Sequence, residues 1–168
     1  MRLTTLCYIE REGAYLMLHR TKKENDQSHD KWLGVGGKFE DAESPEECML
    51  REVREETGLI LRDYAFRGIV TFVSDEWETE YMHLFTATLR GAEQISENSG
   101  EAEPVTDGRD ILRDCDEGVL EWVPKERVCS LNLWEGDRLF LERLNGSRDF
   151  FSLKVEYEGD RLIRWRFF

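Results

Sequence analysis

Three glutamates within one short segment are the residues of this chain best suited to carry out chemistry. Glu52, Glu55 and Glu56 stand at positions i, i+3 and i+4, so a helix places their carboxylates on one face. Like charges at this spacing repel one another by about 0.2–0.5 kcal/mol per pair. A divalent cation would relieve that repulsion, because Mg²⁺ and Mn²⁺ take carboxylate oxygens and bridge to substrate phosphates. The pattern therefore indicates either a metal site or a solvated acidic face.

The residues that flank these glutamates predict the helix that would carry them. Ser44 is a suitable N-cap, and Pro45 occupies the first helical position. Glu47 completes a Ser-x-x-Glu capping box with Ser44. Gly58 follows the last carboxylates, where a left-handed C-cap is expected. We therefore expect a helix between Ser44 and Gly58.

The segment before the helix can bring backbone atoms close to a ligand. Residues 34–37 read Gly-Val-Gly-Gly, and glycine allows close approach of the chain. The carbonyl of Gly37 could then join the carboxylates around an ion. Arg51 could hold the intervening loop by pairing with Glu43, and Glu47 is a second possible partner at i−4.

Residues 37–59 resemble the Nudix box. They read as G-x5-E-x7-R-E-U-x-E-E-x-G-U, where U is a bulky apolar residue, and every fixed position is matched. The resemblance implies a Nudix-type α/β/α sandwich and a Mg²⁺-dependent hydrolase, with Mn²⁺ as a possible substitute. Its substrates would be nucleoside diphosphates linked to another group. The matching residues are Gly37, Glu43, Arg51, Glu52, Val53, Glu55, Glu56, Gly58 and Leu59.

Roles follow from the resemblance position by position. Glu52, Glu55 and Glu56 become metal ligands, assisted by the Gly37 carbonyl. Arg51 joins them in the catalytic set. One of the helix carboxylates, or a glutamate on a later loop, would accept the proton of the attacking water.

Beyond the box the chain is similar to the MutT branch of the family, and especially to the oxidised-purine triphosphatases of animals. By this likeness Glu117 becomes an additional metal ligand or base; otherwise it belongs to an acidic turn before a strand. The likeness rests on Lys31-Trp32-x-Gly-x-Gly-Gly-Lys38, on Asp116-Glu117 ahead of Trp122, on Trp134 before Gly136-Asp137, and on the sequence FFSLKVEYEGD at 150–160.

The same likeness implies how a nucleotide would bind. Trp134 would stack on a purine, and Asp137 would read its polar edge. Phe72 is a second aromatic candidate, and Arg20 and Lys38 would contact the substrate. The alternatives are structural: a tryptophan core anchor, an aspartate in the first turn of a helix, and arginine as a surface cation.

One position departs from the oxidised-purine pattern. Where those enzymes place an asparagine that hydrogen-bonds the base, this chain has Leu33. A site that needed this bond would lose about 1–3 kcal/mol. The expected reaction is hydrolysis of a nucleoside triphosphate to a monophosphate and pyrophosphate, with 8-oxo-dGTP as a candidate substrate. The alternatives are an ADP-ribose or dinucleoside polyphosphate hydrolase, and a nucleotide-binding sensor that does not cleave.

Composition limits the classes of protein and partner. The 168 residues suffice for one domain, 1–168, and the net charge of −13 argues against polymeric nucleic acid as a partner. No apolar run approaches the ~20 residues that span a bilayer, so no membrane association is expected. Four cysteines form no CxxC pair, which favours reduced thiols in a cytoplasmic protein. We expect a monomer or a homodimer.

The remaining pattern predicts an α/β fold in which helices cover both faces of a mixed, mainly antiparallel sheet. Residues 91–113 are rich in acidic and small polar residues and lack hydrophobic periodicity, so they are expected to form a flexible insertion. Residues 134–144 suit a second helix. Strands are expected at 4–10, 14–20, 66–73, 80–89, 119–123, 151–157 and 162–167.

Overall fold

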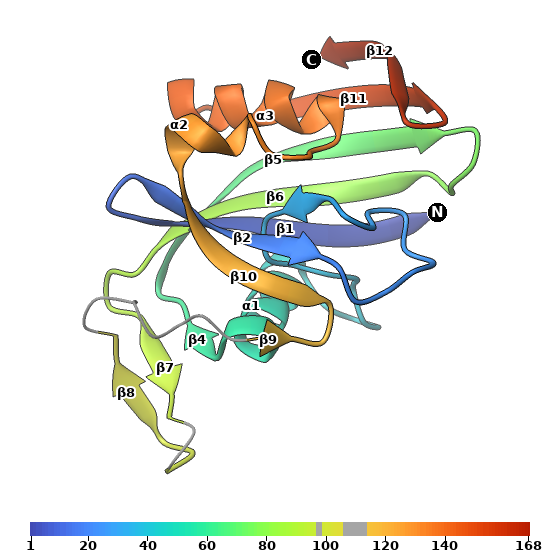
Figure 1. Cartoon of the computed structure of the whole chain (residues 1–168). Helices are drawn as coiled ribbons and strands as arrows, with labels where there is room; N and C mark the ends of the chain where they lie inside the picture. The colour runs from blue at the N-terminus through green and yellow to red at the C-terminus, as the bar shows by residue number, and fades with distance from the viewer. Residues whose placement is uncertain (97–98, 106–113) are drawn as a thin grey trace.

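A large mixed sheet lies between two layers of helix in the computed structural model, which describes residues 1–96, 99–105 and 114–168 (Figure 1). The strand order is β12-β11-β5-β6-β1-β2-β10-β9, with β3 paired to β2. The predicted α/β/α sandwich with a mixed sheet is confirmed.

The central strands combine antiparallel hairpins with two parallel pairings. β1 (Arg2–Arg11) and β2 (Ala14–Arg20) form the first antiparallel pair. β5 (Asp63–Ser74) and β6 (Glu80–Thr88) form the second. β1 runs parallel to β6, and β11 (Phe151–Glu158) runs parallel to β5. The strands were predicted, but these parallel pairings between distant segments were not.

Shorter strands complete the two sides of the sheet. β10 (Gly118–Pro124) pairs with β2 and carries β9 (Asp114–Cys115) at the edge. β3 (Trp32–Leu33) pairs with β2 just before the glycine-rich segment. At the opposite edge, β12 (Arg161–Phe167) pairs with β11. All these additions are antiparallel.

Alternation along the strands divides the interior into two cores. Leu6 and Tyr8 of β1 belong to one cluster of buried residues, whereas Cys7 and Ile9 belong to the other. Successive side chains of a strand point to opposite faces, so the sheet supports a separate core on each side. β1 is buried on both faces and forms the centre of the sandwich.

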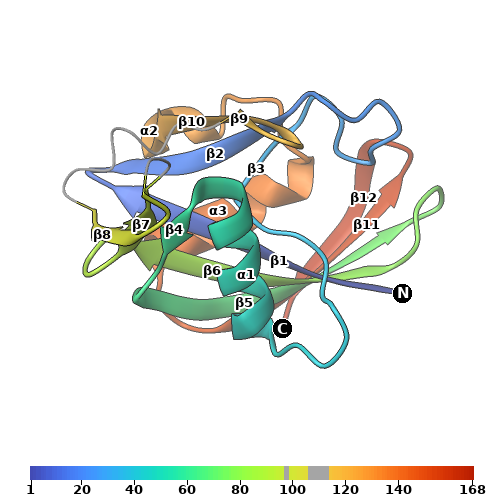
Figure 2. The same ribbon diagram turned by 90° about the horizontal axis from the view of Figure 1, so that it is seen from below.

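Each core is closed by helices. α3 (Glu135–Gly146) covers the first core through Phe140, which is fully buried, and the short α2 (Lys125–Val128) lies beside it. α1 (Pro45–Thr57) covers the second core through Met49 and lies on the other face of the sheet (Figure 2). None of the described helices combines the length and hydropathy needed to cross a bilayer.

Helix α1 begins and ends at the predicted caps. The Ser44 hydroxyl accepts a hydrogen bond from the Glu47 amide at 3.2 Å, and the Glu47 carboxylate accepts one from the Ser44 amide at 2.8 Å. Gly58 has a φ of 75°, and its N–H donates to the Arg54 carbonyl at 2.8 Å. Both ends of the helix are therefore fixed by short-range interactions.

Residues 91–113, predicted to form a flexible insertion, include short strands in their described parts. They contain β7 (Glu93–Ile95) and β8 (Ala102–Pro104), which pair with each other. β7 also pairs with β4 (Leu59–Ile60), directly after α1. Ala92 is buried in the core beneath α1. Backbone pairing with β4, rather than hydrophobic alternation, orders this part; the rest of the predicted insertion lies outside the described residues.

The left-handed cap predicts the effect of one substitution on stability. Gly58→Ala should lower the free energy of unfolding by about 1 kcal/mol, because a Cβ disfavours a positive φ. Urea denaturation with Gly146→Ala as the control checks this, since Gly146 ends a helix without a positive φ and has open space around its α-carbon. Equal stability of Gly58→Ala and the wild type would contradict the prediction.

Candidate active site

A cavity of about 290 Å³ brings together side chains from the loop before α1, the turn before β10 and the start of α3. Most of the residues predicted to form the site line it. The exceptions are Arg51, Glu55 and Glu56, which lie on α1 outside the cavity lining. The predicted residues that line it are Arg20, Gly37, Lys38, Glu52, Phe72, Glu117, Trp134 and Asp137.

The three helix carboxylates do not share one environment. Glu56 is buried, and its carboxylate accepts a hydrogen bond from the Gly36 amide at 3.3 Å. Glu52 lies against Gly37, where an added Cβ would come within 2.4 Å of the glutamate Cδ. Glu55 faces outward with 58% of its side chain exposed. The box glycine is therefore needed for contact with Glu52.

The buried Glu56 and the partly buried Glu52 and Glu117 repel one another. Burial raises the pKa of Glu56 to about 8, and the negative charges of Glu117 and Glu52 raise it further. Burial also raises the pKa of Glu52. These shifts show that Glu117 approaches the helix carboxylates from its loop, as predicted. Hard oxygen donors gathered in this way fit Mg²⁺ or Mn²⁺.

Within the described ranges, no three His, Cys, Asp or Glu side chains converge closely enough to hold an ion as they stand. Glu52 and Glu117 are instead engaged by cationic side chains. The ligand set predicted from the sequence, including Glu55 and the Gly37 carbonyl, therefore stays a prediction.

Arg51 organises the box through a dense set of contacts. Its Nε and Nη2 donate to the two carboxylate oxygens of Glu43 at 2.6 and 2.9 Å. Nη2 also donates to the Lys38 carbonyl at 2.9 Å, and Nη1 donates to Glu52 at 2.8 Å. The hydrogen bonds from Arg51 lower the pKa of Glu43 to about 2. The predicted second partner, Glu47, is wrong because its carboxylate caps the helix instead.

Cationic residues cover the opposite wall of the acidic end. Lys23 donates to one carboxylate oxygen of Glu117 at 2.7 Å, and Arg20 pairs with the other oxygen. Arg20 also pairs with Asp26. The predicted placement of Arg20 at the end of β2 beside the site is therefore seen, and Glu117 is fixed toward the cavity rather than toward solvent.

The other end of the cavity has aromatic walls. Trp134 stands at the N-cap position of α3 and is 5% exposed. Its ring meets Phe72 and Tyr157 edge-on, with centroids 5.5 and 5.1 Å away, and Lys31 lies over it at 4.8 Å. Trp134 is thus both a core anchor and a wall of the cavity, and its predicted stacking on a purine stays a prediction.

Two buried polar atoms in the aromatic end have no hydrogen-bond partner among the described residues. They are Oδ2 of Asp137, which is 4% exposed, and Oε1 of Gln27. Burial raises the pKa of Asp137 to about 8, so its carboxyl group is largely neutral at pH 7. A buried polar group without a partner is unfavourable, which indicates that a polar ligand completes this site.

Sequence reasoning missed several residues of the cavity. Glu80 is buried, lines the cavity and accepts a hydrogen bond from the Thr4 hydroxyl at 2.7 Å. Tyr157 accepts from the Gly136 amide at 2.7 Å. A charged residue beginning an otherwise apolar strand face was a usable signal for Glu80. Gln27 gave no signal, because it stands in a polar loop whose path only the folded chain reveals.

Comparisons with known proteins agree with this geometry. The sequence profile of the NUDIX domain matches residues 1–144. A protein described as an uncharacterized Nudix hydrolase, YvcI of Bacillus subtilis (strain 168), is 23% identical over 142 residues, covering 84% of this chain and 78% of that protein. The crystal structure of a MutT protein from Bacillus halodurans superposes with a TM-score of 0.77, 25% identity, and coverage of 99% and 97% of the two chains. A NUDIX hydrolase from Nitrosomonas europaea shares the fold, with a TM-score of 0.64, 18% identity, and coverage of 89% and 91%.

The sandwich fold, with an acidic helix beside an aromatic-walled cavity, defines a phosphate-cleaving hydrolase. The chain belongs to the Nudix family. It is a Nudix pyrophosphohydrolase, an enzyme class that acts on small-molecule nucleotide substrates.

The buried aspartate predicts a dependence of stability on pH. The pKa of Asp137 is raised from 3.8 to about 8 in the folded protein, so its ionisation destabilises the fold as pH rises through that interval. Asp137→Asn should therefore become more stable than the wild type as pH increases, with the difference levelling off above about pH 8. Melting temperatures between about pH 5.5 and 9 in EDTA measure this. Asp160→Asn, in an exposed turn, is the control. Parallel curves for Asp137→Asn and wild type would contradict the prediction.

Proposed function

We propose that residues 1–168 form one Nudix domain that hydrolyses a nucleoside triphosphate to a nucleoside monophosphate and pyrophosphate, using Mg²⁺ or Mn²⁺. The observation that carries the proposal is one cavity with an acidic end at Glu52 and Glu117 and an aromatic end at Trp134 and Asp137. Such a cavity suits a molecule with a phosphate chain at one end and a base at the other.

The acidic end supplies the residues for the reaction. Glu52, Glu55, Glu56 and Glu117, with the Gly37 carbonyl, would hold the metal, which neutralises charge on the phosphate chain when bound. Arg51 positions Glu52 and the preceding loop through its hydrogen bonds. A helix carboxylate or Glu117 would accept the proton of the attacking water. Arg20 and Lys38 would bind substrate phosphate oxygens, as cations of the same cavity.

The aromatic end would select the base. Trp134 and Phe72 offer broad apolar surfaces, and a neutral Asp137 carboxyl can donate a hydrogen bond as well as accept one. Leu33 lines the cavity and provides no polar group. Gln27 lines it as well and has an unpaired amide oxygen. We infer that Gln27 supplies the amide recognition that Leu33 cannot provide, which keeps oxidised purines such as 8-oxo-dGTP among the candidates.

The setting of the enzyme follows from charge and cysteine chemistry. A net charge of −13 disfavours polymeric nucleic acid, so the proposed partner is a free nucleotide, bound by a monomer or a homodimer. All four cysteines are free thiols, which suits the reducing cytoplasm.

Catalysis can be tested by pyrophosphate release from a panel of normal and oxidised nucleoside triphosphates, ADP-ribose and dinucleoside polyphosphates, with and without Mg²⁺. We expect Mg²⁺-dependent pyrophosphate release from a triphosphate. Glu56→Gln should reduce turnover by about 10²-fold or more. Above about pH 8, where the wild-type carboxylate is ionised, its melting temperature in EDTA should equal or exceed that of the wild type, because a buried charge is removed.

Glu46→Gln is the matched control for this experiment, since it lies in the first turn of the same helix and outside the cavity lining. Binding of a nucleotide without any cleavage would identify a sensor and sink the proposal. Cleavage of ADP-ribose or a dinucleoside polyphosphate alone would replace the substrate class. Loss of activity that came only from unfolding would remove the catalytic role of Glu56.

The role of Gln27 in base selection can be tested separately. Gln27→Leu should lower kcat/KM for the preferred nucleotide by roughly 5- to 150-fold, the equivalent of about 1–3 kcal/mol for a buried hydrogen bond. The value of kcat/KM for poor substrates should fall much less. Gln94→Leu is a change of the same type in β7 and outside the cavity lining. It should leave kcat/KM unchanged for both the preferred nucleotide and the poor substrates. A uniform loss across all nucleotides would show that Gln27 supports the loop rather than reading the base.

A further inference from the structure

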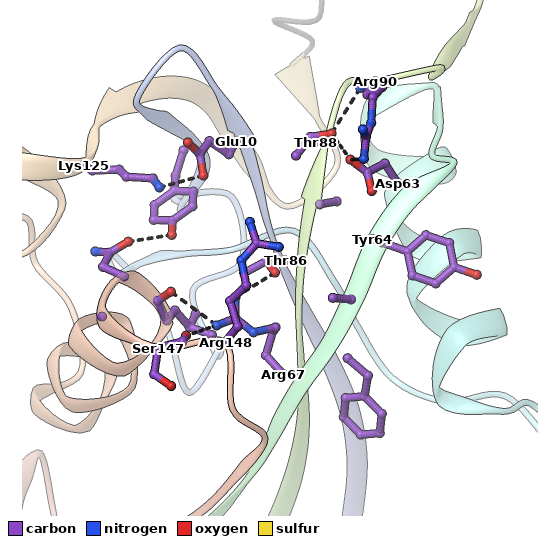
Figure 3. Close-up of a pocket in the computed structure, with 17 residues that line it drawn as sticks. Glu10, Asp63, Tyr64, Arg67, Thr86, Thr88, Arg90, Lys125, Ser147 and Arg148 are labelled. Atoms are coloured by element: carbon purple, nitrogen blue, oxygen red, sulfur yellow. Dashed lines mark hydrogen bonds and ion pairs between the residues drawn. The ribbon is translucent and has the colours of Figure 1, made fainter.

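A second, larger cavity of about 790 Å³ lies at the other end of the elements that build the catalytic cavity (Figure 3). The catalytic cavity uses the N-terminal end of α3, whereas this one uses the residues at its C-terminal end, from Leu144 to Arg148. The same holds for β1, which contributes Thr4–Leu6 to the first cavity and Glu10 to the second. The two cavities share no lining residue among the described parts of the chain.

The charge of this second cavity is opposite to that of the whole chain. Lys125 pairs with Glu10 at 2.6 Å, and Arg90 pairs with Asp63 at 3.0 Å. These pairs use the two acidic residues of the lining. Two further arginines, at positions 67 and 148, have no ion-pair partner within the described ranges. The described lining therefore has four basic and two acidic side chains, an excess of two positive charges in a protein of net charge −13.

Arg67 is held in the floor of the cavity by neutral acceptors. It is 8% exposed, and its Nη1 donates to the Thr86 hydroxyl at 3.0 Å. Its Nη2 donates to the carbonyls of Leu144 and Ser147 at the end of α3. Its buried Nε has no hydrogen-bond partner among the described residues. Burial and the positive charge of Arg148 lower the pKa of Arg67, which shows that the two guanidinium groups act on each other.

Capping of α3 alone does not explain this arrangement. The helix carbonyls account for the Nη2 contacts of Arg67, but they leave its Nε unpaired and give Arg148 no role. The side chains of Arg67, from β5, and Arg148, from the segment after α3, both line the cavity (Figure 3). Two adjacent like charges are unfavourable unless an anion joins them.

We propose that this cavity is an anion site that binds the phosphate group of a small phosphorylated molecule between the guanidinium groups of Arg67 and Arg148. The guanidinium of Arg148 presents a fork of donors that matches phosphate oxygens, and Arg67 adds its positive charge and its unpaired Nε. One arginine is buried and preorganised, and the other is exposed at the mouth. The volume is sufficient for a nucleotide-sized ligand. Inorganic phosphate, pyrophosphate and nucleoside monophosphates all carry the required group.

Isothermal titration calorimetry with these three probes tests the site. EDTA is present throughout, so that no cation draws phosphates to the catalytic carboxylates, and chloride keeps the ionic strength constant. At least one probe should bind the wild type, and Arg148→Gln should weaken that binding at least ten-fold. Arg148→Lys keeps the charge but loses the planar fork of donors. Its affinity should therefore lie between those of the wild type and Arg148→Gln. Arg164→Gln, an exposed arginine of β12 outside the cavity lining, should bind as the wild type does.

Amide shifts in NMR spectra locate the bound probe. Binding should move the signals of Thr86 and Ser147, which contact Arg67, and Arg148→Gln should leave Mg²⁺-dependent hydrolysis unchanged. The ranking of the three probes identifies which source of phosphate the site prefers. The proposal is overturned if none of the probes binds the wild type, if Arg148→Gln binds equally well, or if the shifts lie at Gly36 and Gly37.

Discussion

The carboxylates of the candidate active site repel one another, and the rest of the structure must hold them together against that repulsion. Glu56 and Glu52 lie on one helix, and Glu117 approaches them from a loop distant in sequence. Such a cluster is unfavourable in a protein without a counter-charge, so the surrounding chain must hold it in place. The helix caps fix the ends of α1, and Arg51 ties the loop to the helix through Glu43. The family's phosphohydrolase chemistry uses this negative charge by recruiting a cation.

The two cavities lie at opposite ends of the sheet and differ in charge: one has an acidic end, and the other is basic. Strand β1 is buried on both faces and runs between the catalytic cavity and the basic cavity. Helix α3 does the same on one face, with Asp137 in its first turn and Arg67 bound to the carbonyls at its end. This places an unpaired carboxyl near the positive end of the helix dipole and a cation at the negative end. One frame therefore carries the candidate active site and the proposed anion site at its two ends.

Under the proposed function, substrate choice would rest on polar atoms that the described part of the chain leaves unpaired. Asp137 and Gln27 each present a buried oxygen without a partner among the described residues, and both line the aromatic end of the cavity. Leaving such groups unpaired costs stability, and a base with matching donors would recover it. Leu33, which lines the same cavity, is apolar and cannot hydrogen-bond a base. Gln27, in the loop, would then supply the amide group for that contact. Under the proposed function, a loop residue and a helix residue would together set specificity.

Local pattern alone determined much of this protein. The capping box, Gly58 and the spacing of Glu52, Glu55 and Glu56 predicted α1 and its chemistry, because helix signals act within a few residues. Only tertiary structure decided that Glu55 faces outward, that Arg51 holds Glu43 rather than Glu47, and that β7 pairs with β4. The basic cavity and the position of Gln27 were also beyond the sequence. They depend on parallel pairing of distant strands and on loop paths, which are selected by long-range packing and burial rather than by neighbouring residues.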